Sequence, residues 1–272
     1  MSLEVKKLYI DSRYRTVDSN SDSDFKIQLG RNIFLPDNCV MHIENFSCAH
    51  SWYTIEYGIN DRMYLKVVQS SGTTYNIITI PSTNYTGTEL VAVLQPAFNY
   101  YYPGLFTVSY NISVNRISIA ITSGSFKVLT DSELATRLNN TWTGFNYDST
   151  APGSCNDIIT NRTINNNNPT VPFTSGMLNL QGFRGLYLSS SNLSNYNTLG
   201  PQGENLIIKK ILTNSDFGYL IIDQVVSDHD YLACGRMTLN TIDFQIRDVK
   251  GNLIPFHDSP VSFTVVFSLE SS

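Results

Sequence analysis

Short apolar runs with a period of two recur from one end of the chain to the other, and Gly, Asn, Ser or Pro bounds them. Val, Ile, Phe, Tyr and Thr dominate these runs, and their alternation with polar residues is typical of strands that bury one face. Many short strands separated by turn residues are typical of a β-sandwich or a β-barrel. The sequence therefore predicts a mainly β protein. Strands are expected at residues 25–29, 39–49 and 62–68, and again at 186–189, 206–212, 218–222, 231–234, 238–246 and 261–269.

The middle of the chain has a different pattern. After a short strand expected at residues 75–80, Leu90, Leu94 and Phe98 recur at the spacing of one helix face. Pro96 lies inside this pattern and is expected to kink or shorten the helix, because proline cannot donate the hydrogen bond of a helix interior.

Capping signals bound two helices in this part of the chain. Thr86 or Thr88 is expected to cap the first helix. Residues 130–133, Thr-Asp-Ser-Glu, have the pattern of a capping box before a second, shorter helix. With a hairpin and a further strand between the helices, residues 75–138 are predicted to form a small α+β module.

The composition excludes several classes of protein. No window approaches the ~20 consecutive apolar residues of a membrane helix, and the charged residues of the N-terminal segment argue against a signal peptide. A net charge of −5 argues against wrapping of nucleic acid. In this context the four cysteines are expected to be free thiols in a reducing compartment.

Charged residues make up only 15% of the chain, and Asn, Ser, Thr and Tyr supply the polarity instead. Interfaces are depleted of Lys and Glu and enriched in aromatic residues. The composition therefore favours a protein whose surface is largely covered by neighbours. An A/T-rich genome would also enrich Asn, Ile and Tyr, and composition alone does not separate the two explanations.

Three clusters of polar residues are candidate sites, and an ordinary structural role is favoured for each. Asp228, His229 and Asp230 place carboxylates beside an imidazole, but adjacent strand residues point to opposite faces and no nucleophile motif accompanies them. The remaining two are candidate metal sites: Cys39, His42, Cys48 and His50 for Zn²⁺, and Asp18, Asn20, Asp22 and Asp24 for Ca²⁺.

Neither metal site fits its pattern. Four ligands along one extended strand do not converge on one Zn²⁺ without a sharp bend. The acidic segment has Ser23 where a Ca²⁺ loop needs Gly and Leu29 where it needs a bidentate Glu, so a solvated, flexible turn is expected. The sequence thus predicts no catalytic, cofactor-binding or metal-binding residue, no cofactor, and a protein that is not an enzyme.

The first fifteen residues carry a local charge of +2, from Lys6, Lys7, Arg13 and Arg15 against Glu4 and Asp11. Such a segment suits weak, non-specific contact with nucleic acid. An ordinary solvated terminus is favoured, because two net charges release few counterions.

Several stretches in order resemble the minor capsid (penton) proteins of virophages and of related Polinton-type and giant-virus lineages. Near the N-terminus these are residues 8–15, Leu-Tyr-Ile-Asp-Ser-Arg-Tyr-Arg, and 24–29, Asp-Phe-Lys-Ile-Gln-Leu; in the middle, 85–90, 107–111 and 116–119; and near the C-terminus, 239–244, 247–253 and 260–267. The resemblance spans most of the chain and omits residues 139–175.

The resemblance implies a single jelly roll that forms homopentamers in the virion, at the vertices of an icosahedral capsid, next to a separate major capsid protein with a double jelly roll. It implies synthesis in the host cytoplasm and no catalytic residue. On this reading residues 1–74 and 176–272 form the jelly roll, 75–138 are the inserted module, which is expected to project from one end of the sandwich, and 139–175 are a loop or linker.

Two other classes of function stay open at this level. Trp52, Tyr53, Trp142 and Tyr147 would suit a carbohydrate- or receptor-binding β-sandwich if they were exposed on loops, although burial against the core is favoured. A jelly-roll enzyme of the cupin kind would need a cluster of histidines, and the four here are widely separated.

Overall fold

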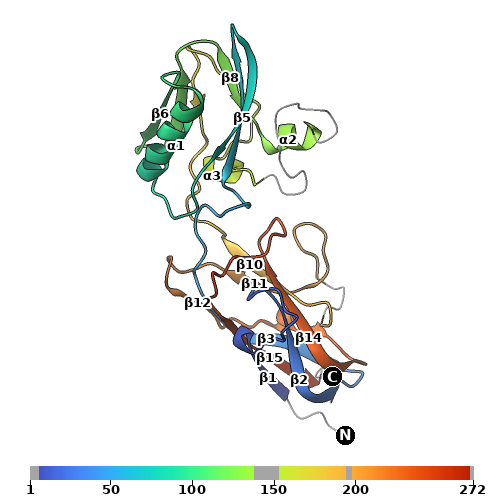
Figure 1. Ribbon diagram of the computed structural model, residues 1–272. Helices are drawn as coiled ribbons and strands as arrows, with labels where there is room; N and C mark the ends of the chain where they lie inside the picture. Colours follow the sequence, from blue (N-terminus) through green and yellow to red (C-terminus); the bar gives the residue numbers. More distant parts are fainter. Residues whose placement is uncertain (1–5, 138–152, 194–197, 270–272) are drawn as a thin grey trace. The chain divides into compact units, whose positions relative to one another are not determined.

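The computed structural model describes residues 6–137, 153–193 and 198–269, which form two compact units (Figure 1). The first unit comprises Met1–Trp52 and Phe183–Ser272, drawn in blue and in yellow through orange to red. The second unit is the continuous segment Tyr53–Gly182 between them. The described residues contain no helix that is both long enough and apolar enough to span a membrane.

The first unit consists of two antiparallel sheets. One sheet has the strand order β1-β15-β3-β12, with β13 also paired to β3, and the other has the order β11-β10-β14-β2. The strands are β1 (Lys6–Asp11), β2 (Asp24–Phe34), β3 (Cys39–Ala49), β10 (Gly185–Ser189), β11 (Ile207–Leu212), β12 (Leu220–Asp223), β13 (Leu232–Ala233), β14 (Thr238–Arg247) and β15 (Val261–Leu269).

The order of these strands is that of a jelly roll. When β12 and β13 are taken as two parts of one strand, the chain contributes its first, eighth, third and sixth strands to one sheet. The second, seventh, fourth and fifth strands form the other sheet, and this distribution of eight strands over two sheets is a jelly roll. The predicted fold class, a mainly β protein with a jelly-roll sandwich, is confirmed.

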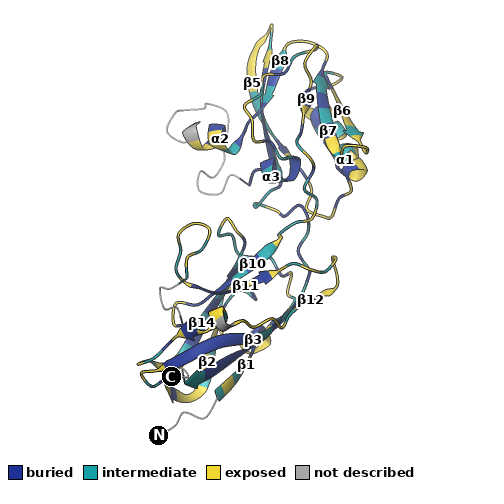
Figure 2. Ribbon diagram, turned by 180° about the vertical axis from the view of Figure 1, so that it is seen from behind, coloured by how far each residue is buried: buried dark blue, intermediate teal, exposed yellow. Residues whose placement is uncertain are grey.

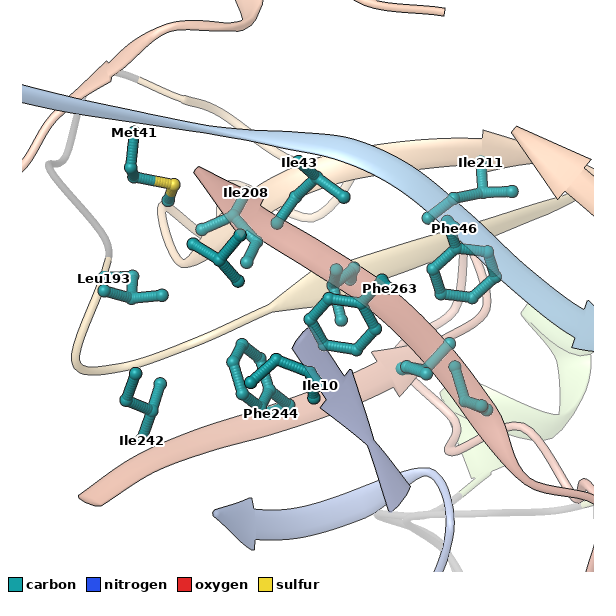
Figure 3. Close-up of a cluster of buried hydrophobic side chains, with 14 of the residues drawn as sticks. Ile10, Met41, Ile43, Phe46, Leu193, Ile208, Ile211, Ile242, Phe244 and Phe263 are labelled. Carbon is teal, nitrogen blue, oxygen red and sulfur yellow. The ribbon is translucent and has the colours of Figure 1, made fainter. Parts of the chain in front are cut away.

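Aromatic side chains from both sheets meet in the core of this sandwich. Phe263 of β15 lies with its ring centroid 4.9 Å from Phe244, 6.0 Å from Phe46 and 6.5 Å from Phe25. Figure 3 shows three of these rings together with Ile10 from β1, and β3 is dark blue along most of its length in Figure 2. Complete burial of one such side chain contributes about 1.5–3 kcal/mol.

The described residues of the second unit form two three-stranded sheets and three helices. Its sheets have the orders β5-β4-β8 and β6-β7-β9. The elements are β4 (Arg62–Gln69), β5 (Gly72–Thr79), α1 (Gly87–Tyr101), β6 (Phe106–Asn111), β7 (Arg116–Ile121), β8 (Ser125–Val128), α2 (Asp131–Arg137), α3 (Asn156–Ile159) and β9 (Phe173–Thr174).

Helix α1 forms as the pattern indicates, except at its proline. Thr86 is the N-cap, with a reciprocal capping box to Glu89, so the first of the two expected caps is the one used. Pro96 does not shorten the helix, which continues to Tyr101. The turn beyond the proline carries Phe98, whose side chain is 0% exposed, and its burial helps to offset the lost hydrogen bond.

The second unit is wider than the expected module of residues 75–138. Strand β4, predicted for the main sandwich, pairs with β5 and β8 instead, while β1 supplies the first strand of the jelly roll. A run of apolar residues identifies β4 as a strand, but it does not identify the sheet to which the strand belongs.

The expected loop at 139–175 is largely part of this unit. Residues 139–152 of that prediction lie outside the described residues. From residue 153 onward the segment includes α3 and β9, and its asparagines bond to β8: Asn165 Oδ1 accepts from Val128 N at 3.0 Å, and Asn167 N donates to Phe126 O at 2.8 Å. Hydrophobic periodicity does not detect a segment that is held in place by such hydrogen bonds.

Candidate assembly surface

The Asp228–Asp230 segment forms a short 3-10 helix, η2, in the first unit. His229 is exposed. The Oδ2 atom of Asp230 accepts a hydrogen bond from Ser227 N at 2.8 Å, so this carboxylate caps its own turn. The geometry of this Asp–His pair is that of a surface turn.

The candidate zinc ligands have separate surroundings. The ring centroid of His42 lies 4.6 Å from that of Tyr231, whereas the ring of His50 is tilted against Trp52 at 4.4 Å and its Nδ1 lies 2.8 Å from Ser215 O. Within the described residues, no three His, Cys, Asp or Glu side chains come together as a metal site.

The two cysteines of that candidate site are buried apart from the histidines. The Sγ atom of Cys39 lies 3.7 Å from that of Cys234, and burial raises the pKa of the Cys39 thiol. Burial raises the pKa of Cys48 to about 12. Both thiols are therefore protonated at neutral pH and behave as small apolar side chains.

The acidic segment at residues 18–24 is more ordered than a flexible turn, so that expectation is wrong for Asp22. This side chain is buried, and its Oδ1 accepts from Ser12 Oγ at 2.5 Å and from Arg15 Nη1 at 2.7 Å. Asp18 remains exposed and pairs with Lys26 Nζ at 2.7 Å, which holds the pKa of Asp18 at about 2. The two carboxylates therefore hold the connection between β1 and β2 in place through these hydrogen bonds and ion pairs.

The aromatic residues considered for carbohydrate binding are not a stacking platform in the described part of the chain. Trp52 is 0% exposed and belongs to the core of the first unit, in line with the favoured interpretation. Tyr53 is partly buried. Trp142 and Tyr147 lie outside the described residues.

The jelly roll has two unlike sides. The edge strands of its sheets are β1 and β12 in one sheet and β2 and β11 in the other. In Figure 1, β3 and β15 lie between β1 and β12. We call residues 6–34 the β1–β2 flank and residues 207–235 the β11–β12 flank.

A buried lysine organises the β11–β12 flank. Between β12 and β13 the chain leaves β3, and Lys209 of β11 reaches across to this gap. Its Nζ donates to Val225 O at 2.6 Å and to Ile43 O at 3.3 Å, and it lies 3.6 Å from Asp223 Oδ1. The ammonium thus replaces strand pairing at the break and holds the loop after β12 in place.

Strand β12 presents apolar side chains to solvent. Ile221 points into the core, while Leu220 and Ile222 are 60% and 50% exposed on the other face. No described strand pairs with its outer edge. We define the apolar edge as the exposed residues of this segment, Phe217, Tyr219, Leu220, Ile222, Val225 and Val226.

Charge distinguishes the two flanks. The β11–β12 flank contains four Asp against Lys209 and Lys210, and both lysines precede its segment 213–235, which has all four Asp and no Lys or Arg. The β1–β2 flank contains six Lys and Arg against four Asp, and its exposed apolar side chains are Tyr9, Tyr14, Val17 and Phe34. One side is therefore apolar and acidic, and the other is apolar and weakly basic.

Sequence reasoning identified a strand at residues 218–222 and missed its exposed apolar edge. The available signal was Val225-Val226 directly after a strand and the lack of Lys or Arg around it. Periodicity did not reveal the exposure, because an edge strand and a central strand have the same pattern.

Comparisons with known proteins place the fold in context. No protein-family profile and no curated protein matches the chain. Among solved structures, the chain is similar to the crystal structure of mavirus penton protein, with a TM-score of 0.47 and 12% sequence identity over 98% of this chain and 100% of that one.

Proposed function

We propose that this chain is a minor capsid protein of the penton type, a structural protein of the virion. Its copies form homopentamers at the vertices of the icosahedral capsid of a virophage-like double-stranded DNA virus. It acts by assembly and not by catalysis, and it is made in the host cytoplasm.

One observation carries the proposal: the stretches that resemble penton proteins are hydrogen-bonded neighbours in the jelly roll. The N-terminal stretch lies on β1, which pairs with the C-terminal stretch on β15, Leu8 opposite Val265. The second stretch lies on β2, which pairs with the stretch on β14, Ile27 opposite Ile242. Residues that are remote in sequence thus form adjacent strands.

The two unlike flanks support a ring. A closed ring of five copies has heterologous contacts, in which one side of a subunit meets a different side of the next. A subunit with an apolar, acidic side and an apolar, weakly basic side has the chemistry that such contacts require.

The partners in the capsid follow from the same proposal. A major capsid protein with a double jelly roll would surround the ring. Contact of the N-terminus with the genome stays a prediction, and the structure limits its strength. Lys7, Arg13 and Arg15 are already paired with Glu44, Asp11 and Asp22, respectively.

Electron microscopy of the purified full-length chain in negative stain tests the proposal. We expect rings with five-fold symmetry and, in sedimentation velocity, a mass five times the 30.5 kDa of the chain. Closed rings with another number of subunits, or monomers at every concentration accessible, would contradict it. A glycan array provides the test of the carbohydrate-binding alternative, for which we expect no binding.

A further inference from the structure

We propose that the apolar edge of one copy docks against the β1–β2 flank of a neighbouring copy. This inference rests on the proposed function and specifies the subunit contact within it. One side of the contact is the apolar edge, Phe217–Val226, with the acidic residues around it. The other side is the β1–β2 flank, residues 6–34.

The apolar edge has the properties of a surface that is covered in the assembled state. Tyr219 and Val225 are 70% and 75% exposed, alongside the outward-facing Leu220 and Ile222 of β12. A free, hydrophobic edge strand promotes aggregation, and β proteins normally protect such an edge with Lys, Pro or a covering segment. The segment 213–235 lacks Lys, Arg and Pro, so its own sequence supplies neither of the first two protections.

The charges indicate that the apolar edge of one copy contacts the β1–β2 flank of another copy and not a second apolar edge. If two apolar edges met each other, Asp216, Asp223 and Asp230 of both copies would face like charges, which is unfavourable at an interface. The β1–β2 flank has six Lys and Arg against four Asp, and Arg31 is exposed on it. The complementary contact is therefore head to tail.

The β1–β2 flank also supplies apolar contact area. Tyr9 of β1 is 80% exposed, Tyr14 is 79% exposed and Phe34 at the end of β2 is 65% exposed. Tyr and Phe bury a large area and are enriched in the centres of interfaces. Both sides of the proposed contact thus combine exposed apolar groups with charges of opposite sign.

Two variants that each block one side test this arrangement. Leu220→Lys with Ile222→Lys blocks the apolar edge, and Tyr9→Glu with Phe34→Glu blocks the β1–β2 flank. All four side chains are exposed, so both variants should fold, which circular dichroism verifies. The matched control, Tyr100→Lys with Ile112→Lys, makes the same kind of change at exposed positions of the second unit.

A head-to-tail contact predicts a specific result when the variants are mixed. Each blocked variant alone should be monomeric at concentrations where the wild type and the control assemble. An equimolar mixture should give a one-to-one heterodimer, because each partner contributes the side that the other has lost. Sedimentation velocity or mass photometry measures the species.

The outcomes separate this inference from the proposed function. If the variant blocked at the β1–β2 flank dimerises by itself, the edge pairs with another edge and the inference is wrong. If both variants still form five-membered rings, the contact lies elsewhere while the proposed function stands. If the mixture forms heterodimers but the wild type forms open chains, the contact is right and the ring is wrong. If the wild type and the mixture are both monomeric, both proposals fail.

Discussion

The two units of the chain achieve their folds with contacts of very different range. In the jelly roll, β1 pairs with β15 and β2 pairs with β14, so residues more than 200 positions apart are direct neighbours. In the inserted unit, β4 pairs with β5 across a two-residue turn, and β6 pairs with β7 in a hairpin. The sandwich therefore requires both ends of the chain, whereas much of the insert is built from local pairings.

This difference has consequences for folding. Long-range strand pairing is slow, because the entropy of loop closure is lost before the contacts form. The inserted unit shortens that loop if it folds first, since it converts the long connection between β3 and β10 into a compact structure. We expect the two units to unfold as separate cooperative transitions, and the predictions below test that separation.

The largest expected effect comes from truncating the central ring of each core. Phe263→Ala removes a 1% exposed ring in contact with both sheets of the jelly roll, and Phe98→Ala removes a 0% exposed ring that lies 5.0 Å from Phe106 in the insert. Each change should cost about 3–5 kcal/mol in its own unit. Peptide-resolved hydrogen exchange of the full chain measures the free energy of opening for each unit.

Each variant serves as the control for the other. Phe263→Ala should lower protection throughout β1, β3 and β15 while the peptides of α1 keep theirs, and Phe98→Ala should do the reverse. Equal loss of protection in both units with either variant would mean that the chain unfolds as one cooperative unit.

The second effect concerns the buried ammonium of Lys209 in the jelly roll. The described residues of the insert contain no buried lysine. Lys209→Met keeps the length of the side chain but leaves Asp223 and the carbonyls of Ile43 and Val225 without their donor. Loss of one partner of a buried ion pair is strongly destabilising, and we expect a cost of about 2–4 kcal/mol, discounted because Asp223 is partly exposed.

Lys210→Met is the matched control for this change. Lys210 is the next residue on β11, is exposed, and lies 5.8 Å over the ring of Tyr187. We expect a cost of less than about 1 kcal/mol from loss of this cation–π contact. Chemical denaturation followed by exchange in the β11–β12 peptides compares the two variants, and similar costs would contradict the bridging role of Lys209.

The same contrast explains what the sequence predicts and what it does not. Strand periodicity identifies most strands of both units, because alternation reports a half-buried strand wherever it lies. Pairing partners are not encoded locally, so Arg62–Gln69 is recognised as a strand and assigned to the wrong sheet. The segment from residue 153 to 182 is missed for a related reason, since side-chain amides such as Asn165 hold it in place.

The candidate surface is harder to predict than the fold. The unequal charge of the two flanks can be read from the sequence once residues 6–34 and 213–235 are known to lie on opposite sides. That knowledge comes from the strand order, which places β1 and β12 at opposite edges of one sheet. The exposure of Leu220 and Ile222 follows from the same edge position and not from their own pattern.

The third effect is local, and it tests a feature of the insert that the sequence alone reveals. Thr86→Ala removes the side-chain acceptor of Glu89 N and one half of the capping box, so it should destabilise α1 by about 1 kcal/mol. Thr88→Ala, at the alternative cap, should be nearly neutral because Thr88 lies within the helix and is exposed. A larger cost for Thr88→Ala, in thermal unfolding of the full chain, would reverse the assignment of the cap.

The smallest effect is a difference in pH dependence between the units. All four histidines belong to the first unit. Burial lowers the pKa of His42 below its ordinary value, so the native state binds fewer protons than the unfolded state there. Stability from this group is present above the unfolded pKa of about 6.5 and is lost as the pH falls below it. In the insert, burial raises the pKa of Asp61, so its contribution has the opposite sign and declines as the pH rises through the folded-state pKa.

Lowering the pH from about 7.5 to about 5.5 should therefore reduce the stability of the jelly roll and leave that of the insert unchanged or higher, with each change below about 1.4 kcal/mol per pH unit for one proton.

His42→Phe keeps an aromatic ring beside Tyr231 and removes the titrating group, so it should flatten the pH dependence of the first unit only. Asp61→Asn removes this buried carboxyl and should stabilise the second unit at neutral pH. Hydrogen exchange, corrected for the intrinsic rate at each pH, resolves the two units. A jelly roll whose stability has the same pH slope with and without the His42 imidazole would contradict the assignment of this titration to His42.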